Sequence, residues 1–245
     1  MKIAHISDIH CGSANTFNAN MLSQCIDEVN DLNPDITIVT GDLSMNGLRT
    51  ELEEAFERLK EINTKKLVVP GNHDARNVGY LTFERLFGSR YQKRVIDDIQ
   101  IICCDSSEPD LNIGQIGRER VQWLKEELEE ANAGYTIIAL HHHLIPVPLT
   151  GRERNVLYDS GDVLKLVYDA GVNLVLSGHK HVPHNWVMES SSGATIFCTA
   201  GSVSSYKLNA DYHNCYSIID VSDGKIKIEI KNIGKEGNVV VDRKF

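Results

Sequence analysis

Short apolar runs alternate with amphipathic stretches along the first three quarters of the chain. The runs are rich in Ile and Val and are bounded by turn residues, which is typical of strands covered on both faces of a sheet. They occupy residues 2–7, 36–40, 66–69, 99–104, 136–140 and 173–177. Between several of them, apolar positions recur at helical spacing, in stripes that begin at Met21, Leu52, Val121 and Val163. Such stripes predict helices packed on a sheet.

After residue 185 the pattern changes to strands separated by turns. These later strands are expected at residues 186–189, 194–198, 214–220, 225–231 and 238–242. The earlier strand–helix alternation predicts an α/β layered domain. The later strands predict a second sheet packed on the first, giving a sandwich flanked by helices. Because no linker, repeat or low-complexity tract interrupts residues 1–245, we expect a single domain.

Composition narrows the class of protein. The 245 residues are 42% hydrophobic and 24% charged, which is ordinary for a soluble globular protein. A formal charge of −9 argues against a dedicated nucleic-acid surface, since such surfaces are usually basic. No apolar run approaches the roughly 20 residues that span a bilayer, and no signal peptide precedes the first run. Six cysteines without CxxC spacing predict buried thiols in a reducing compartment. We therefore expect a cytoplasmic protein that needs no membrane or nucleic-acid partner; the pattern carries no signal for an oligomeric state.

Five short polar blocks follow the apolar runs. They are Asp8-x-His10, Gly41-Asp42, Gly71-Asn72-His73-Asp74, His141 and Gly178-His179-x-His181. In open α/β sheets, functional residues gather beyond the carboxyl ends of the strands, so the blocks are expected to be neighbours in space. Their carboxylate, amide and imidazole groups form a ligand list for two adjacent divalent ions, with Asp42 as the bridge. The glycines are expected to permit sharp turns and close backbone approach.

The order and residue types of these blocks resemble the calcineurin-like metallophosphoesterase superfamily. The resemblance implies a four-layer α/β/β/α sandwich of two mixed sheets flanked by helices. It also implies that one ion is held by Asp8, His10, Asp42 and His181, and the other by Asp42, Asn72, His141 and His179. In that family the residue matching His73 faces the substrate phosphate and protonates the leaving oxygen. Asp74 is then expected to orient and charge-stabilise the His73 imidazole.

The fourth block departs from the family pattern. Members often have His-His-Pro-Pro at this point, whereas this chain has His141-His142-His143-Leu144. The first histidine after the strand is the usual ligand, which favours His141. Because the two prolines are absent, a register in which His142 is the ligand stays open.

Within the superfamily, the closest pattern is that of the class III cyclic nucleotide phosphodiesterases. There GDL and VPGNHD are separated by one amphipathic helix, as they are here between Gly41 and Asp74. The resemblance implies hydrolysis of a cyclic nucleotide or similar small diester by attack of a metal-bound hydroxide at a dinuclear centre. A phosphomonoesterase or nuclease on the same fold, or a non-catalytic scaffold, are the alternatives. Imidazole with carboxylate suits manganese, iron or zinc.

Two loops are candidates for setting specificity, at residues 105–110 and 151–155. Three arginines, Arg76, Arg152 and Arg154, could contact a substrate phosphate, because a guanidinium matches its oxygens in a bidentate fork. Surface ion pairs are the alternative interpretation of all three.

Overall fold

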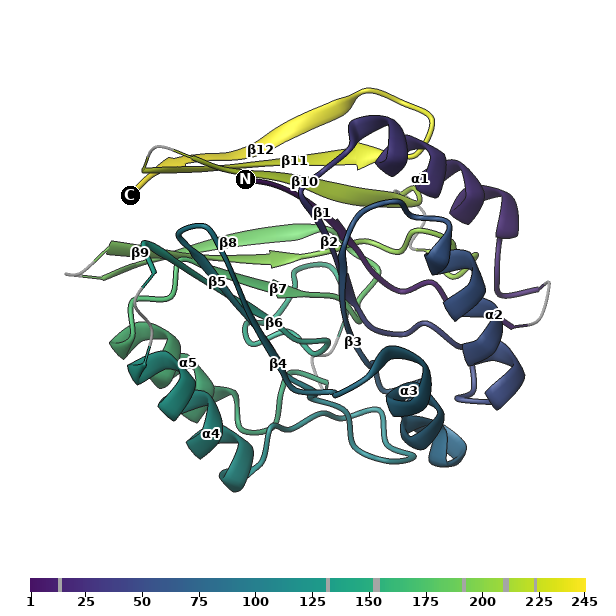
Figure 1. Cartoon of the computed structure of the whole chain (residues 1–245), viewed down its shortest axis with the longest axis horizontal. Coiled ribbons are helices and arrows are strands. Elements are labelled where there is room, and N and C mark those ends of the chain that lie inside the picture. The colour runs from purple at the N-terminus through teal and green to yellow at the C-terminus, as the bar shows by residue number, and fades with distance from the viewer. Residues whose placement is uncertain (13–14, 131–132, 152–154, 191–192, 209–211, 223) are drawn as a thin grey trace.

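The computed structural model describes residues 1–12, 15–130, 133–151, 155–190, 193–208, 212–222 and 224–245. Within these residues the strands form two six-stranded sheets, which Figure 1 shows stacked face to face. The first sheet has the order β12-β11-β10-β1-β2-β3 and the second β4-β5-β6-β7-β9-β8. Each sheet has a parallel core extended by antiparallel strands, so both sheets are mixed, as expected.

The first sheet is built from both ends of the chain. Its strands are β1 (Lys2–Ile6), β2 (Ile36–Thr40), β3 (Lys66–Val69), β10 (Cys215–Ser222), β11 (Lys225–Asn232) and β12 (Gly237–Lys244). The second sheet takes the middle of the chain. Its strands are β4 (Gln92–Ile96), β5 (Ile99–Cys103), β6 (Tyr135–Ala139), β7 (Leu174–Ser177), β8 (His184–Ser190) and β9 (Gly193–Thr199).

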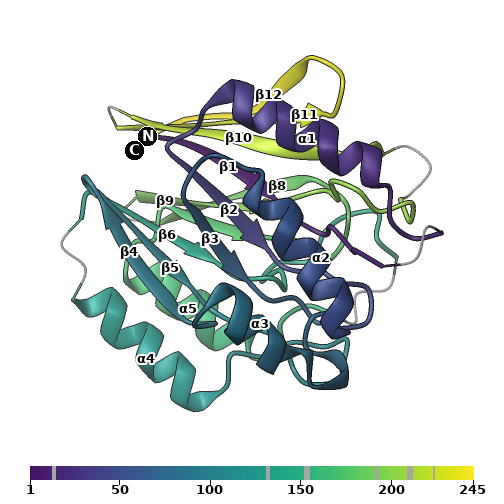
Figure 2. The ribbon, with the colours of Figure 1, turned by 45° about the vertical axis from the view of Figure 1, so that its right-hand side comes forward.

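Helices cover the outer face of each sheet, which completes the four-layer α/β/β/α sandwich (Figures 1 and 2). The first sheet carries α1 (Ala19–Leu32), α2 (Arg49–Lys60) and α3 (Gly79–Phe87), the last preceded by the 3-10 turn η1 (Arg76–Val78). The second carries α4 (Arg118–Glu129) and α5 (Ser160–Asp169). The fold class predicted from the sequence is therefore confirmed. None of the helices in the described part of the chain has the length and apolar character needed to cross a bilayer.

Three apolar clusters fill the spaces between the four layers. Along β1, Ile3 packs between the sheets, whereas Ala4 and Ile6 pack under the outer helices. A third cluster lies between the second sheet and helices α4 and α5. Because successive side chains of a strand point to opposite faces, burial on both faces turns the strand sequence into a continuous apolar run.

The later strands do not form a sheet of their own, contrary to the expectation above. Instead β10 pairs antiparallel with β1 and brings β11 and β12 with it, while β9 joins β7 and pairs with β8. The added strands satisfy edges that the parallel strands β1 and β7 would otherwise leave unpaired. Each sheet thus combines strands from before and after residue 184.

Candidate metal centre

The five polar blocks converge because their strands end at the same side of the sandwich. Backbone hydrogen bonds hold the loops together directly after the strands. The amide of Asp8 donates to the carbonyl of Gly41 at 3.0 Å, and the amide of His10 to that of Asp42 at 2.8 Å. In the second sheet, the amide of Gly178 donates to the carbonyl of His141 at 2.9 Å. The strand exits therefore place the predicted ligands within reach of one another.

The backbone is strained at most of these positions. Asp8, His10, Asp42, His179 and His181 all have positive φ, between 52° and 76°. Left-handed backbone costs a residue other than glycine on the order of 1–3 kcal/mol and persists only where the surroundings impose it. Strain at five of the seven predicted ligands indicates that the loop conformations direct these side chains toward the site, at a cost to the stability of the fold.

The glycines beside the ligands have no room for a side chain. A Cβ atom on Gly71 would collide with the carboxylate of Asp42, and one on Gly178 would collide with the hydroxyl of Ser7. Gly41 has a φ of +88° and lies against the backbone of Gly71. These contacts confirm that the glycines permit close approach of the loops, as the sequence suggested.

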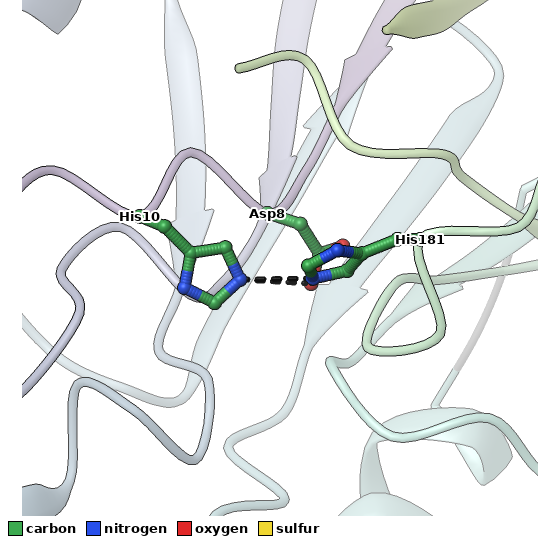
Figure 3. Close-up of side chains that lie close together, drawn as sticks. All are labelled: Asp8, His10 and His181. Carbon is green, nitrogen blue, oxygen red and sulfur yellow. Dashed lines mark hydrogen bonds and ion pairs between the residues drawn. The ribbon is translucent and has the colours of Figure 1, made fainter. Parts of the chain in front are cut away.

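The first cluster consists of Asp8, His10 and His181, whose side chains point toward one another in Figure 3. The Nε2 atoms of the two imidazoles are 2.9 Å apart. From Oδ1 of Asp8 the distance is 3.3 Å to Nε2 of His181 and 3.9 Å to Nε2 of His10. Three buried or half-buried donor atoms thus surround one point.

The second cluster consists of Asn72, His141 and His179. Oδ1 of Asn72 lies 3.1 Å from Nε2 of His141 and 2.9 Å from Nδ1 of His179. The two ring nitrogens are 3.2 Å apart. An amide oxygen and two imidazole nitrogens therefore surround a second point.

Asp42 lies between the clusters and faces both. Its Oδ2 is 3.6 Å from Nε2 of His10 in the first cluster, and its Oδ1 is 3.4 Å from Nε2 of His141 in the second. Burial by itself would raise the pKa of this carboxyl, but His141 and His73 hold the pKa well below its usual range. Asp42 is thus a buried carboxylate with one oxygen toward each cluster.

Hydrogen bonds fix the tautomers of two histidines. Nδ1 of His141 is 2.6 Å from the carbonyl of Thr40, and Nδ1 of His181 is 2.9 Å from the carbonyl of Lys207. Because a carbonyl only accepts, each Nδ1 carries the hydrogen, which leaves Nε2 as the atom facing the cluster. Burial opposes a charge on His141, yet the nearby carboxylate of Asp42 raises its pKa to about 9. A site that draws a proton so strongly also fits a cation.

The neighbouring His142 does not face either cluster. Its Nδ1 is 2.9 Å from the hydroxyl of Ser106, and its Nε2 is 3.3 Å from the carbonyl of Asn112. Burial lowers its pKa to about 3, so the ring is neutral and both nitrogens have partners. This geometry favours His141 over His142 as the ligand in the fourth block.

His73 lies at the mouth of the site, with Nε2 at 3.9 Å from Oδ2 of Asp42. The partner of its Nδ1 is the carbonyl of Met45, at 2.6 Å. Asp74 does not orient this ring, which corrects the role predicted from the sequence. Its carboxylate instead accepts backbone amides of Leu43, Ser44 and Gly71, at 2.8 to 3.1 Å.

Asp74 therefore ties the second and third blocks together. The buried backbone amides of these two tight loops need a hydrogen-bond acceptor, and the carboxylate of Asp74 supplies it. The imidazole of His73 already has an acceptor in the carbonyl of Met45. Burial and the neighbouring Asp42 raise the pKa of Asp74 to about 6.

A cavity of about 300 Å³ opens over the clusters. Arg76, Lys180 and Lys207 contribute to its rim, and Asn112 lines one wall. Asn112 was not identified from the sequence, although it follows by two residues the loop 105–110 named as a specificity candidate. Its only sequence signal is its place in the loop after a buried strand.

The other candidates for substrate contact are placed unevenly. Arg76 reaches the cavity wall, where Nη2 donates to Oδ1 of Asn112 at 2.7 Å. Arg152 and Arg154 lie outside the described residues. Within the loop 105–110, Asp105 is buried and pairs with Arg90 rather than facing the cavity.

Comparisons with known proteins show the family and the fold. A family model described as Calcineurin-like phosphoesterase matches residues 1–183. The chain is 25% identical over 227 residues to the 3',5'-cyclic adenosine monophosphate phosphodiesterase CpdA of Haemophilus influenzae, covering 88% of this chain and 80% of that protein. It is 29% identical over 202 residues to a cAMP/cGMP dual specificity phosphodiesterase of Mycobacterium tuberculosis, covering 75% of this chain and 62% of that protein.

The solved structure of a dimetal phosphatase from Danio rerio matches with a TM-score of 0.76 at 13% identity. The match covers 98% of each chain, which shows a shared fold.

Proposed function

The chain belongs to the calcineurin-like phosphoesterase family of phosphate-ester hydrolases, and we propose that it is a phosphodiesterase that acts on a cyclic nucleotide or similar small diester at a dinuclear metal centre. The observation that carries the proposal is the position of Asp42. One carboxylate with an oxygen toward each of two imidazole-containing clusters is the arrangement that two adjacent divalent ions require.

Two bound cations would supply positive charge to the phosphoryl oxygens and activate the attacking water. The first would be held by Asp8, His10, His181 and Asp42, and the second by Asn72, His141, His179 and Asp42. Nitrogen and oxygen donors of these kinds suit manganese, iron or zinc.

His73 is the proton donor in this proposal. Because its Nδ1 hydrogen is directed at the carbonyl of Met45, the atom that exchanges a proton with substrate is Nε2, on the cavity side. A protonated Nε2 can donate to the leaving oxygen as its bond to phosphorus breaks. Asp74 assists by holding the loop that carries His73 against the loop that carries Asp42.

Two observations support a small diester as substrate. The named relatives act on cyclic nucleotides by their descriptions, and the cavity of about 300 Å³ has a cationic rim suited to an anion. The formal charge of −9 disfavours a nuclease with a broad nucleic-acid surface. The six cysteines are free and buried, which supports a reducing location such as the cytoplasm.

Assays of the purified protein with added manganese test the proposal, using bis-p-nitrophenyl phosphate, p-nitrophenyl phosphate and cyclic AMP as substrates. We expect turnover of the diesters to exceed turnover of the monoester. Turnover of p-nitrophenyl phosphate alone would overturn the diesterase assignment in favour of a phosphomonoesterase. Metal analysis separates both from a scaffold, since the enzyme should bind close to two ions per chain.

A further inference from the structure

An amide ligand poses a problem that a carboxylate does not. The side chain of Asn72 can be turned by 180° about its last bond with little change of shape, but only one orientation directs oxygen at the second cluster. The other directs an NH2 group, which has no lone pair for a cation. Something around Asn72 has to select the orientation.

Asn112 makes that selection through a chain of hydrogen bonds. Oδ1 of Asn112 accepts from Nη2 of Arg76 at 2.7 Å and from Nδ2 of Asn72 at 3.3 Å. Because a guanidinium only donates, the Asn112 atom that faces Arg76 has to be oxygen. The same oxygen then requires the NH2 group of Asn72, which leaves the Asn72 oxygen facing His141 and His179.

The backbone of Asn112 is also held in place. Nε2 of His142 lies 3.3 Å from its carbonyl oxygen, and Nδ1 of the same ring accepts from the hydroxyl of Ser106. Gly114, two residues further along the loop, lies so close to His142 that a Cβ atom on Gly114 would collide with the imidazole ring. His142 thus links the block that carries His141 to the loop that carries Asn112.

We propose that Asn112 is a positioning residue that sets the amide orientation of Asn72 and thereby the affinity of the second cluster for a divalent ion. This inference rests on the proposed dinuclear function and names a residue that acts through Asn72 without touching the ion. Arg76 in turn fixes the orientation of the Asn112 amide. The guanidinium therefore determines the direction of both hydrogen bonds, from Arg76 to Asn112 and from Asn72 to Asn112.

Manganese titration of chelator-treated protein, followed by calorimetry and by the number of ions retained per chain, tests the proposal. Asn112→Ala removes the acceptor and should weaken the second binding step by about 10- to 100-fold, the usual effect of removing a group that orients a ligand. The first step should be unchanged. Asn112→Asp retains an oxygen toward both donors and should keep the second step within about threefold of wild type.

Asp110→Ala is the matched control, because Asp110 lies in the same loop and caps the amide of Asn77 without reaching the clusters. It should bind both ions as wild type does. Two wild-type binding steps in Asn112→Ala would overturn the proposal, as would an Asn112→Asp variant that loses the second step as fully as Asn112→Ala. A wild-type protein that binds no second ion would instead contradict the dinuclear function itself, so the two failures are distinguishable.

Discussion

The two clusters of this site are built alike and differ in one ligand. Both have two imidazoles and share Asp42, but the first adds the carboxylate of Asp8 where the second adds the amide of Asn72. The carboxylate brings charge and presents oxygen in either orientation. The amide brings no charge and presents oxygen in only one, which makes the second cluster dependent on its neighbours.

The difference leads to an expected order of binding. Counting Asp42 in each, the first cluster has two carboxylates and the second has one, so the first should hold a divalent ion more tightly. Each cluster has one histidine whose Nδ1 is held by a backbone carbonyl, His181 by Lys207 and His141 by Thr40, so this support does not distinguish the two clusters. Metal binding at the first cluster therefore relies on the charge of its carboxylates, whereas binding at the second relies on the orientation of the Asn72 amide.

Removing the shared carboxylate should have the largest effect. Asp42→Asn keeps the shape of the side chain but removes the charge that both clusters use. We expect the rate of diester hydrolysis to fall by about 10³-fold, at the upper end for loss of one charge-stabilising group, and both ions to bind more weakly. Steady-state kinetics and metal analysis measure the two effects. Retention of two tightly bound ions would show that Asp42 is no bridge.

A variant of His73 tests whether this residue is a proton donor or a ligand of the first cluster. Its Nε2 also lies close enough to Asp42 and His10 for the three to form a ligand group of their own. If His73 acts on the leaving oxygen, His73→Ala should lower kcat by about 10²-fold or more while leaving the metal content unchanged. A substrate with a better leaving group should lose less. Loss of an ion in this variant would instead assign His73 to the first cluster.

Asp8→Asn makes the first cluster resemble the second. The variant replaces the carboxylate by a neutral amide, and the backbone amide of His179, which donates to both oxygens of Asp8 at 3.1 to 3.2 Å, competes for the one oxygen that remains. The first binding step should therefore weaken by about 10- to 100-fold. The second step should then become the tighter one. Manganese titration by calorimetry follows both steps, and an unchanged order of binding would contradict the explanation by charge.

The sequence predicted where the strands lie along the chain better than it predicted which strands pair with one another. Strands buried on both faces are continuous apolar runs, so β1, β2 and β3 were placed within a residue or two. The edge strand β4 was missed because its sequence, QKRVI, is half-exposed and mostly polar. The distribution of later strands over both sheets was also missed, since strand pairing leaves no local pattern.

The site shows the same division. Residues at strand exits could be found from the sequence because position along a strand determines where they lie, and the structure brings Asp8, Asp42 and His141 together as expected. Their roles as ligands stay predictions. The partners of Asp74 and the contribution of Asn112 depend on which way a loop side chain turns, and no spacing in the sequence encodes that.

Two buried histidines show what a carboxylate does to an imidazole. Burial opposes a charge on both rings, but the adjacent carboxylate of Asp42 outweighs it at His141 and raises the pKa to about 9. At His5, whose Nε2 bonds to the hydroxyl of Thr40, burial outweighs the opposing effect of Asp8 and lowers the pKa to about 3. The unfolded chain therefore takes up a proton at His5 below pH 6.5 while the folded chain does not. Stability should fall as the pH drops from 6.5 toward 3, by about 1.4 kcal/mol per pH unit from this group.

Urea unfolding of chelator-treated protein above and below pH 6.5 measures the effect, with His5→Gln as the variant that cannot titrate. Because all other groups are common to both proteins, the difference between their pH slopes isolates His5. Below pH 6.5 we expect the free energy of unfolding of the variant to depend on pH less steeply than that of wild type, by about 1.4 kcal/mol per pH unit, the slope that one proton gives. Equal slopes would mean that His5 gains a proton in the folded protein too, and that burial does not keep this imidazole neutral.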